Sequence, residues 1–443
     1  MSPLPGWIPA PLRQNGPLHL TWALLASAWI ALVAAWQWPL IQLGGQPVLT
    51  TALFAVIYLP LAALGVGGFV ALIGPELERT VESKNIARIA RLDHLRFFAA
   101  ALVVLYHYFG KVVTVDSHSR HIVANILVQG SSGVDIFFVL SGFIFGLISY
   151  QRKIRYLDFI WSRVVRIYPL YLLAILLVLG THAEKFLPLD SVLLVFPIFI
   201  VGYLVALPGF GQLWTVGLEF QFYLIFPFLA AFLLRNGYRY LVALLLLAIG
   251  LRAFYYMEMG TVKNLSYGSL PGRIDQFLIG IGAAWLFLKK REFFSHPLHL
   301  VVSAILGVAA LQWLVAWDGL GTGAGSMLWT VWPTISGAIW GYLALSYVSC
   351  RIPLPAFVDQ SLAKLGALSF SIYVMHDFAV VWSLKYARSL SITGRLDVDA
   401  ELKGVFICLP LAVGIAWCTY HLIEKQFFVF RRKYVEAAEA PAV

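Results

Sequence analysis

Long apolar stretches follow one another along most of this chain, and they constrain its fold more than any other feature. Thirteen of them are long enough to cross a bilayer, which takes about 20 residues of α-helix. Charged residues make up 12% of the sequence, whereas a soluble domain carries about 25%. The sequence therefore predicts an all-α polytopic membrane protein.

The basic residues between these stretches predict how many of them cross and in which direction. Lys and Arg concentrate on the cytoplasmic side of membrane proteins. If all thirteen stretches crossed, the main basic clusters would fall on both sides; if 189–207 does not cross, these clusters all fall on one side. Lys385, Arg388 and Arg395 are exceptions on the outer side. Pro197 inside that stretch also fits an interrupted helix. We therefore expect about twelve transmembrane helices, a re-entrant segment near 189–207, and both termini in the cytoplasm.

The chain divides into three expected regions. Residues 1–91 form an N-terminal extension of two helices followed by a charged linker. Residues 92–433 form a core of ten helices, and residues 434–443, rich in Ala and Glu, form a short disordered tail.

Arg96 and His107 lie in one of the apolar stretches, where ionisable residues are costly and commonly mark a functional path. They are eleven residues apart, which is three helical turns plus about 20°, so both lie on the same helix face, roughly 16 Å apart. With Asp93 nearby, Arg96 would be a cationic entry for a phosphorylated donor and His107 an imidazole base deeper in the membrane. The alternative is a topological arginine and an interfacial histidine.

Other polar residues sit at comparably unusual positions. Asp135 opens an apolar stretch that also contains Ser141, next to Gly142, where small residues favour close helix packing. Arg163 and Arg166 are three residues apart at the start of the next stretch, a spacing that suits phosphate, although topology alone could explain them.

Three more candidates follow in the second half of the chain. Glu219 is a carboxylate within an apolar stretch and is expected to orient and stabilise His107; a structural ion pair with an arginine is the alternative. Arg273 is placed to meet an acceptor or Glu219, or else to extend towards solvent from a helix end. His376 shares a helix face with Ser369 and Tyr373, and a structural hydrogen bond explains it as well as catalysis does.

Several common sites are missing from the sequence. We find no Walker loop, no dinucleotide-binding glycine motif and no Gly-x-Ser-x-Gly elbow. The three cysteines and the histidines of the 114–121 loop have no spacing typical of a metal site, so no metal is expected. The net charge of +10 is attributed to membrane orientation rather than to nucleic-acid binding.

Taken together, these motifs resemble the membrane-bound acyltransferase-3 family over about residues 90–430. The resemblance rests on a motif in which ten residues separate Arg96 from His107, and on the segment Ser132–Phe143. It extends through Arg163, Arg166, Tyr168 and Pro169, through Trp214–Tyr223, and through Leu365–His376 and Ile423–Lys425. The chain departs from the family pattern at Phe220, where a second glutamate is usual, so only Glu219 can serve there.

The resemblance implies transfer of an acyl group, commonly acetyl, from cytoplasmic acyl-CoA to a hydroxyl of a glycan or lipid-linked glycan outside the membrane. It implies a bacterial inner-membrane location, acyl-CoA as co-substrate without a permanently bound cofactor, and contact with polysaccharide-assembly proteins. His107 and Glu219 would be catalytic, and Arg96, Arg163 and Arg166 would bind the CoA phosphates. The remaining candidates are substrate-binding or structural residues: Asp93, Asp135, Ser141, Tyr168, Trp214, Tyr223, Arg273 and His376.

Two other classes of function stay open on the sequence. Twelve helices with both ends inside are common among transporters and flippases, although such proteins often contain internal repeats, and none is visible here. A scaffold in a polysaccharide-export complex would leave His107 and Glu219 dispensable.

Overall fold

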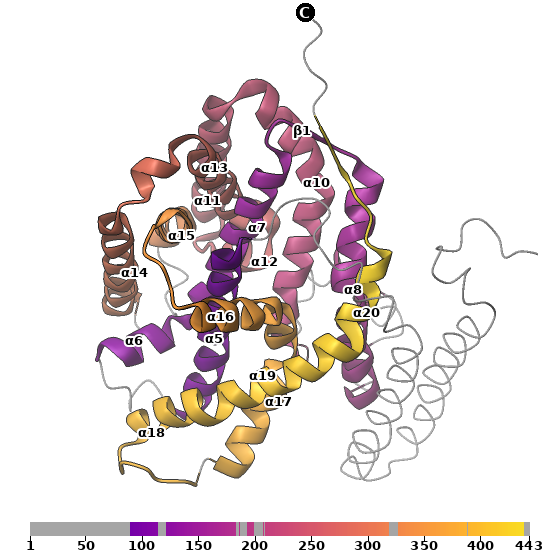
Figure 1. The fold of residues 1–443 in the computed structure, drawn as a ribbon. Coiled ribbons are helices and arrows are strands. Elements are labelled where there is room, and N and C mark those ends of the chain that lie inside the picture. The colour runs from indigo at the N-terminus through magenta and orange to yellow at the C-terminus, as the bar shows by residue number, and fades with distance from the viewer. Residues whose placement is uncertain are drawn as a thin grey trace, which may run out of the picture. The chain divides into compact units, whose positions relative to one another are not determined.

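The structure is a computed structural model that describes residues 89–113, 121–182, 186, 193–198, 207, 209–318, 327–387 and 389–437 (Figure 1). The predicted N-terminal helix pair and most of the predicted re-entrant segment 189–207 lie outside these residues. The described residues form two compact units. The larger comprises those within 85–160, 197–417 and 433–443, and the smaller those within 161–196 and 418–432.

Helices make up nearly all of the described chain. The larger unit contains α5 (Ala90–Val112), α6 (Ile122–Val128), η3 (Gly130–Ser132), α7 (Gly133–Ser149), η6 (Gly211–Leu213), α10 (Trp214–Asn236), α11 (Tyr238–Met259), α12 (Lys263–Gly268), α13 (Leu270–Phe294), α14 (Pro297–Asp318), η7 (Met327–Thr330), α15 (Trp332–Ser349), α16 (Ala356–Ala367), α17 (Ser369–Ala387), α18 (Leu396–Lys403) and η8 (Gly404–Cys408). The smaller unit contains η9 (Tyr420–Glu424), α20 (Lys425–Phe427) and η10 (Phe428–Phe430), while α8 (Tyr156–His182) and α19 (Leu409–Thr419) each run from one unit into the other.

The lengths and composition of these helices confirm an integral membrane protein. Seven described helices are long and apolar enough to span a bilayer, and an eighth is obtained if α16 and α17, which meet at a bend of 71°, count as one span. Helices α13 and α15 are not among the seven, although the sequence predicts spans at 273–288 and 327–348. Both have many buried residues, so the interior of the protein accommodates their polar groups.

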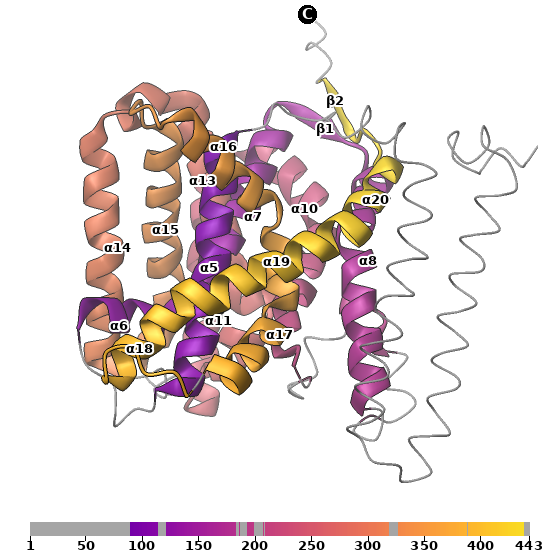
Figure 2. The ribbon, with the colours of Figure 1, turned by 60° about the horizontal axis from the view of Figure 1, so that its bottom comes forward.

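The core of the larger unit lies where α5, α7, α13 and α15 pack together (Figures 1 and 2). Two glycines allow the closest of these contacts. A Cβ atom on Gly142 of α7 would lie 2.0 Å from the carbonyl oxygen of Phe277, and one on Gly280 of α13 would lie 2.1 Å from that of Val139. The predicted close packing at Gly142 is therefore confirmed, because no larger residue fits between the two backbones.

The end of the larger unit packs across α5. Helix α18 and the π-helical segment η8 run obliquely over α5, as Figure 2 shows. Before them, α17 lies against α5 and brings its polar face to the same helix. Residues far apart in the sequence thus meet at the second half of α5.

Two short strands correct the prediction for the C-terminal tail. Strand β2 (Val435–Ala437) pairs antiparallel with β1 (Arg152–Ile154), in the register that sets Arg152 opposite Ala437. The side chain of Arg155 also bonds to the carbonyl oxygen of Lys433. The expected disordered tail at 434–443 is therefore wrong in its first residues, which are held by main-chain pairing; residues 438–443 lie outside the description.

Candidate active site

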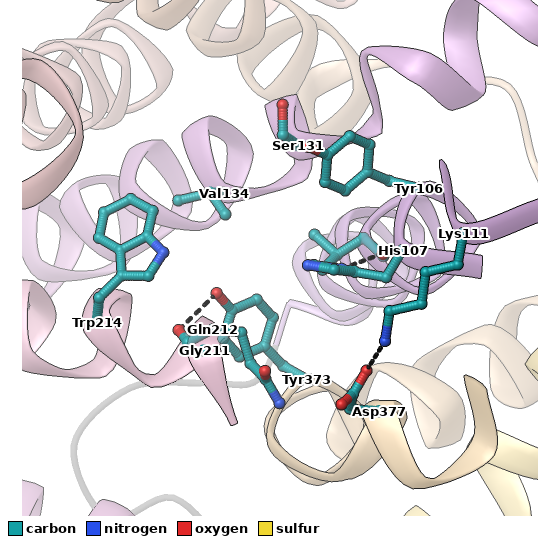
Figure 3. A pocket seen from close by; sticks show the side chains of 11 residues that line it. Tyr106, His107, Lys111, Ser131, Val134, Gly211, Gln212, Trp214, Tyr373 and Asp377 are labelled. Atoms are coloured by element: carbon teal, nitrogen blue, oxygen red, sulfur yellow. Dashed lines mark hydrogen bonds and ion pairs between the residues drawn. The ribbon is translucent and has the colours of Figure 1, made fainter. Parts of the chain in front are cut away.

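A cavity of about 300 Å³ opens in the larger unit beside the second half of α5 (Figure 3). It is lined by α5, by the junction of η3 and α7, by the junction of η6 and α10, and by α17. The lining residues are Val103, Tyr106, His107, Lys111, Ser131, Val134, Gly211, Gln212, Trp214, Tyr373 and Asp377. Two predicted site residues, His107 and Trp214, thus share one cavity, and Trp214 lies across it from His107 (Figure 3).

The hydrogen bonds of His107 define which of its ring nitrogens carries the proton. Its Nδ1 lies 2.9 Å from the carbonyl oxygen of Val103, one turn earlier in α5, and 3.1 Å from Nε2 of His376. A carbonyl oxygen can only accept, so Nδ1 carries the hydrogen in the neutral ring. The other nitrogen, Nε2, then holds a lone pair, and it has no hydrogen-bond partner among the described residues.

His376 is the partner of His107, and the sequence alone does not reveal this. Its side chain is fully buried in α17, and its Nδ1 lies 2.7 Å from the carbonyl oxygen of Tyr373. This bond places the hydrogen of neutral His376 on Nδ1, so its Nε2 accepts from Nδ1–H of His107. The two rings are 4.8 Å apart between centroids. The polar helix face formed by Ser369, Tyr373 and His376 was the sequence feature that pointed to this contact. It did not indicate which helix packs against that face.

An ion pair stands beside the two histidines. The ammonium of Lys111, one turn after His107, lies 2.6 Å from a carboxylate oxygen of Asp377, the residue after His376 (Figure 3). Both side chains line the cavity, and Lys111 is the more exposed of the two. No sequence pattern predicted this pair, although each residue is close in sequence to a histidine of the site.

A second group of hydrogen bonds holds the opposite wall of the cavity. The hydroxyl of Thr215 donates to that of Tyr373 over 2.8 Å, and Tyr373 donates to the carbonyl oxygen of Gln212 over 3.1 Å. The side-chain amide of Gln212 in turn donates to the carbonyl oxygen of Val374 over 2.8 Å. These bonds fasten the start of α10, and with it Trp214, to α17.

Glu219 does not pair with His107, so that prediction is wrong. Its carboxylate accepts hydrogen bonds from Ser141 of α7, over 2.8 Å, and from Tyr223, one turn later in α10. Among the described residues, no arginine forms an ion pair with Glu219 either. Three predicted site residues, Glu219, Ser141 and Tyr223, thus form one hydrogen-bonded group that does not line the cavity. The carboxylate is satisfied by these two hydroxyl donors, one from α7 and one from α10.

Arg273 pairs with Asp135 rather than with Glu219. Its guanidinium forms a buried ion pair with Asp135 at 2.6 Å and bonds to the carbonyl oxygen of Ser266. The second oxygen of Asp135 accepts from Ser336 of α15. The pair joins α13 to the first turn of α7, directly after the cavity residues Ser131 and Val134. Burial at 4% exposure excludes the alternative that Arg273 extends into solvent from a helix end.

The predicted phosphate-binding arginines lie in different units. Arg96 and Asp93 belong to α5 of the larger unit and form an ion pair at 3.4 Å. Arg163 and Arg166 belong to the part of α8 in the smaller unit. Tyr168 follows them there, and its hydroxyl donates to the carbonyl oxygen of Val195 over 2.7 Å.

The described residues contain no cluster of three or more His, Cys, Asp or Glu side chains arranged to hold a metal ion. His121, at the edge of the loop considered above, instead faces Glu401 at 3.1 Å and Asp397 at 3.8 Å.

Several known proteins are similar in sequence to this chain over half of its length or more. It is 32% identical over 317 residues to the exopolysaccharide production protein ExoZ of Rhizobium meliloti, covering 67% of this chain and 89% of that protein. It is 30% identical over 253 residues to the O-acetyltransferase OatA of Staphylococcus aureus, covering 50% and 39%. A putative O-acetyltransferase of Staphylococcus aureus is 23% identical over 384 residues, covering 78% and 58%. This chain thus spans less than two thirds of the length of the two staphylococcal proteins.

No solved structure matches the chain significantly. A family described as "Acyltransferase domain" matches residues 89–421, which include every residue of the cavity. This confirms the resemblance noted from the motifs: the chain belongs to the acyltransferase-3 family.

Proposed function

We propose that this protein is a membrane O-acyltransferase that moves an acetyl group from acetyl-CoA to a hydroxyl of a polysaccharide or its lipid-linked precursor. Membership of the acyltransferase-3 family supports the reaction type. Two of its relatives, named as an exopolysaccharide production protein and an O-acetyltransferase, support the acceptor and the acyl group.

The observation that carries the proposal is the state of His107. Its Nδ1–H is held by two acceptors, and its Nε2 is free among the described residues to accept a proton at the cavity. A general base needs this arrangement, since one nitrogen is oriented by a partner while the other faces the substrate.

The proposed reaction is a direct transfer. Nε2 of His107 removes the proton of the acceptor hydroxyl as its oxygen attacks the thioester carbonyl of acetyl-CoA. The tetrahedral intermediate then breaks its carbon–sulfur bond, and the leaving thiolate takes the proton back from Nε2. The products are an acetyl ester and free CoA, and His107 returns to its starting state.

His376 acts in this scheme through His107. When Nε2 gains a proton, the imidazolium of His107 is stabilised by the two acceptors on Nδ1, Val103 and His376. Asp377 stands next to this pair, but its carboxylate is already bound to Lys111. His376 is thus a positioning residue rather than one that touches the substrate.

The arginines keep their predicted role as part of the proposal. The phosphates of CoA would bind to Arg163 and Arg166 of the smaller unit, at the cytoplasmic side. Arg96, in the larger unit, is a separate candidate for binding phosphate. Planar guanidinium groups suit phosphate because they can donate two parallel hydrogen bonds.

The test is an acetylation assay on membranes that contain the protein, with labelled acetyl-CoA and the host polysaccharide. We expect His107→Ala to reduce the rate about 100-fold or more, the usual contribution of a general base. Mass spectrometry of the surface polysaccharide should then show loss of the acetyl mass. Glu219→Gln, which keeps the shape of the group at Ser141, serves as a comparison for a role outside the cavity.

Two results would contradict this proposal. Acetylation by His107→Ala at the wild-type rate would reject the assignment of His107 as the base. Movement of a glycan or lipid across the membrane in the absence of acetyl-CoA would favour a transporter instead.

A further inference from the structure

A group of arginines in the smaller unit has a feature that the transfer mechanism does not use. Arg431 follows the last helical residues of the chain, and its guanidinium stacks over the ring of Phe428 at 3.4 Å. Its Nε and Nη2 atoms are buried and have no hydrogen-bond partner among the described residues. Buried guanidinium donors that lack a partner are costly, so a ligand for them is expected.

The main chain brings Arg431 close to the start of α8. The hydroxyl of Ser162 donates to the carbonyl oxygen of Arg432 over 3.0 Å and accepts from its backbone N–H over 3.1 Å. Trp161 donates to the carbonyl oxygen of Phe430 over 2.9 Å. Because these contacts involve the neighbours of Arg163 and of Arg431, they hold the two arginines near each other.

Electrostatics agree with this placement. Burial, followed by the charges of Arg166 and Arg163, lowers the pKa of Arg431, and the nearby carboxylate of Glu424 is a weaker opposing influence. The described residues of this unit carry five fixed positive charges, on Arg163, Arg166, Lys425, Arg431 and Arg432, against the single carboxylate of Glu424. Like charges this close repel one another, and an anion bound among them would relieve that repulsion.

We propose that Arg431 joins Arg163 and Arg166 in one anion site that binds a phosphate-bearing ligand. The assignment of that ligand rests on the proposed function, within which it is the nucleotide part of CoA. CoA carries three phosphate groups, and within the smaller unit Arg431 supplies a third guanidinium beside those of Arg163 and Arg166. The indole of Trp161 is 42% exposed and fixed by its bond to Phe430, and the guanidinium of Arg432 lies over its ring at 5.4 Å from the centroid. The part of the ring that stays exposed offers a surface beside the site on which an adenine can stack.

A phosphate could also come from an anionic lipid, and the experiment separates the two sources. The full-length protein is purified in detergent, and the binding of adenosine 3′,5′-bisphosphate is measured by calorimetry and by the rise in melting temperature. This nucleotide has no pantetheine arm, so its binding does not depend on acyl transfer. In a second arm, the protein is placed in phosphatidylcholine nanodiscs with or without phosphatidylglycerol.

We expect Arg431→Met to weaken nucleotide binding about tenfold or more, the effect of losing a charge-assisted hydrogen bond. Arg431→Lys keeps the charge but not the planar guanidinium, so its affinity for the nucleotide should lie between those of the wild type and Arg431→Met. His107→Ala should bind as the wild type does, so a failure of the catalytic proposal would leave this result unchanged. Arg351→Met is the matched control, because Arg351 is a 72% exposed arginine in the larger unit.

Without ligand, Arg431→Met should melt no lower than the wild type, because it removes an uncompensated charge. A lower melting temperature together with unchanged nucleotide affinity would mean a structural role and would overturn the site. Stabilisation by phosphatidylglycerol but not by the nucleotide, dependent on Arg431, would overturn the assignment to CoA. If neither nucleotide binding nor stabilisation by phosphatidylglycerol depends on Arg431, the anion site is rejected.

Discussion

The pairing of His107 with His376 makes a specific demand on the second ring. His376 holds its own proton on Nδ1 through the carbonyl oxygen of Tyr373, which leaves Nε2 to accept from His107. A side chain with no acceptor at that point would leave Val103 as the sole partner of Nδ1. His107 would then keep its tautomer but lose part of its stabilisation when protonated.

At this scale we predict the effect of His376→Phe, which keeps a ring but removes both nitrogens. The rate constant kcat should fall about 10- to 100-fold, the effect of one hydrogen bond to a charged group. KM for the acceptor should change little, because His376 is fully buried and does not line the cavity. Steady-state kinetics on membranes measure both constants.

Trp382→Phe, an exposed substitution on the same helix, is the control for general effects on α17. An unchanged kcat per folded molecule in His376→Phe would show that His376 supports the fold alone.

Of the residues predicted from the sequence, His107 and Trp214 lie at the cavity, whereas the contacts expected for Glu219 and Arg273 differ from those observed. Burial of an ionisable residue reveals that it needs a partner, but several types of partner satisfy the same need. Glu219 is satisfied by hydroxyls and Arg273 by Asp135, and both outcomes depend on how α7 packs against its neighbours.

Among the elements, the crossing of α7 and α13 positions much of the polar interior. Gly142 and Gly280 bring the two backbones together, and Arg273 and Asp135 join the same two helices by an ion pair. Since Asp135 lies in the first turn of α7, this crossing also supports the cavity wall at Ser131 and Val134.

For this element we predict that Gly142→Ala destabilises the protein. The added Cβ would lie 2.0 Å from a backbone oxygen, which cannot move as a side chain would, so the helices must separate. Overpacking of this kind costs about 1–3 kcal/mol or more. The melting temperature of the protein in detergent, followed by size-exclusion chromatography of the heated sample, provides the measurement.

Gly250→Ala in α11 is the matched control, because a Cβ there meets no atom within 4 Å. It should be neutral or stabilise the helix by up to about 1 kcal/mol. Equal melting temperatures for the two variants would contradict the role assigned to the crossing.

Helices were predicted accurately where they coincide with long apolar stretches. The stretch 92–109 appears as α5, Ala90–Val112, and 212–234 appears as α10, Trp214–Asn236. Strand β2 was missed because three residues are too few for a pattern, and its pairing with β1 depends on residues nearly 300 positions away.

On the scale of the whole molecule, the orientation in the membrane remains a prediction from the charges of the loops. The positive-inside rule assigns Arg235, at the end of α10, to the cytoplasm, and Asp318, at the end of α14, to the outside. Both helices are among those long enough to span.

We therefore predict that a cysteine at position 318 reacts with a membrane-impermeant maleimide in intact cells, whereas one at position 235 reacts only after permeabilisation. The background variant is Cys418→Ser, because Cys418 is exposed while Cys350 and Cys408 are buried. The substitutions Asp318→Cys and Arg235→Cys are each made in that background. Reversed labelling would invert the topology and would place the arginines assigned to CoA on the outer side, away from cytoplasmic acetyl-CoA.

By itself the sequence determined that this is a helical membrane protein, that it belongs to the acyltransferase-3 family, and that Arg96 and His107 lie on one helix. Those conclusions rest on hydropathy, motif order and helical period, which are local properties of the chain. Tertiary structure alone decided that His376 orients His107, that hydroxyls satisfy Glu219, and that Asp135 pairs with Arg273. These partners are separated by between 78 and 269 positions, and a local pattern reveals which face of a helix is polar but not what packs against it.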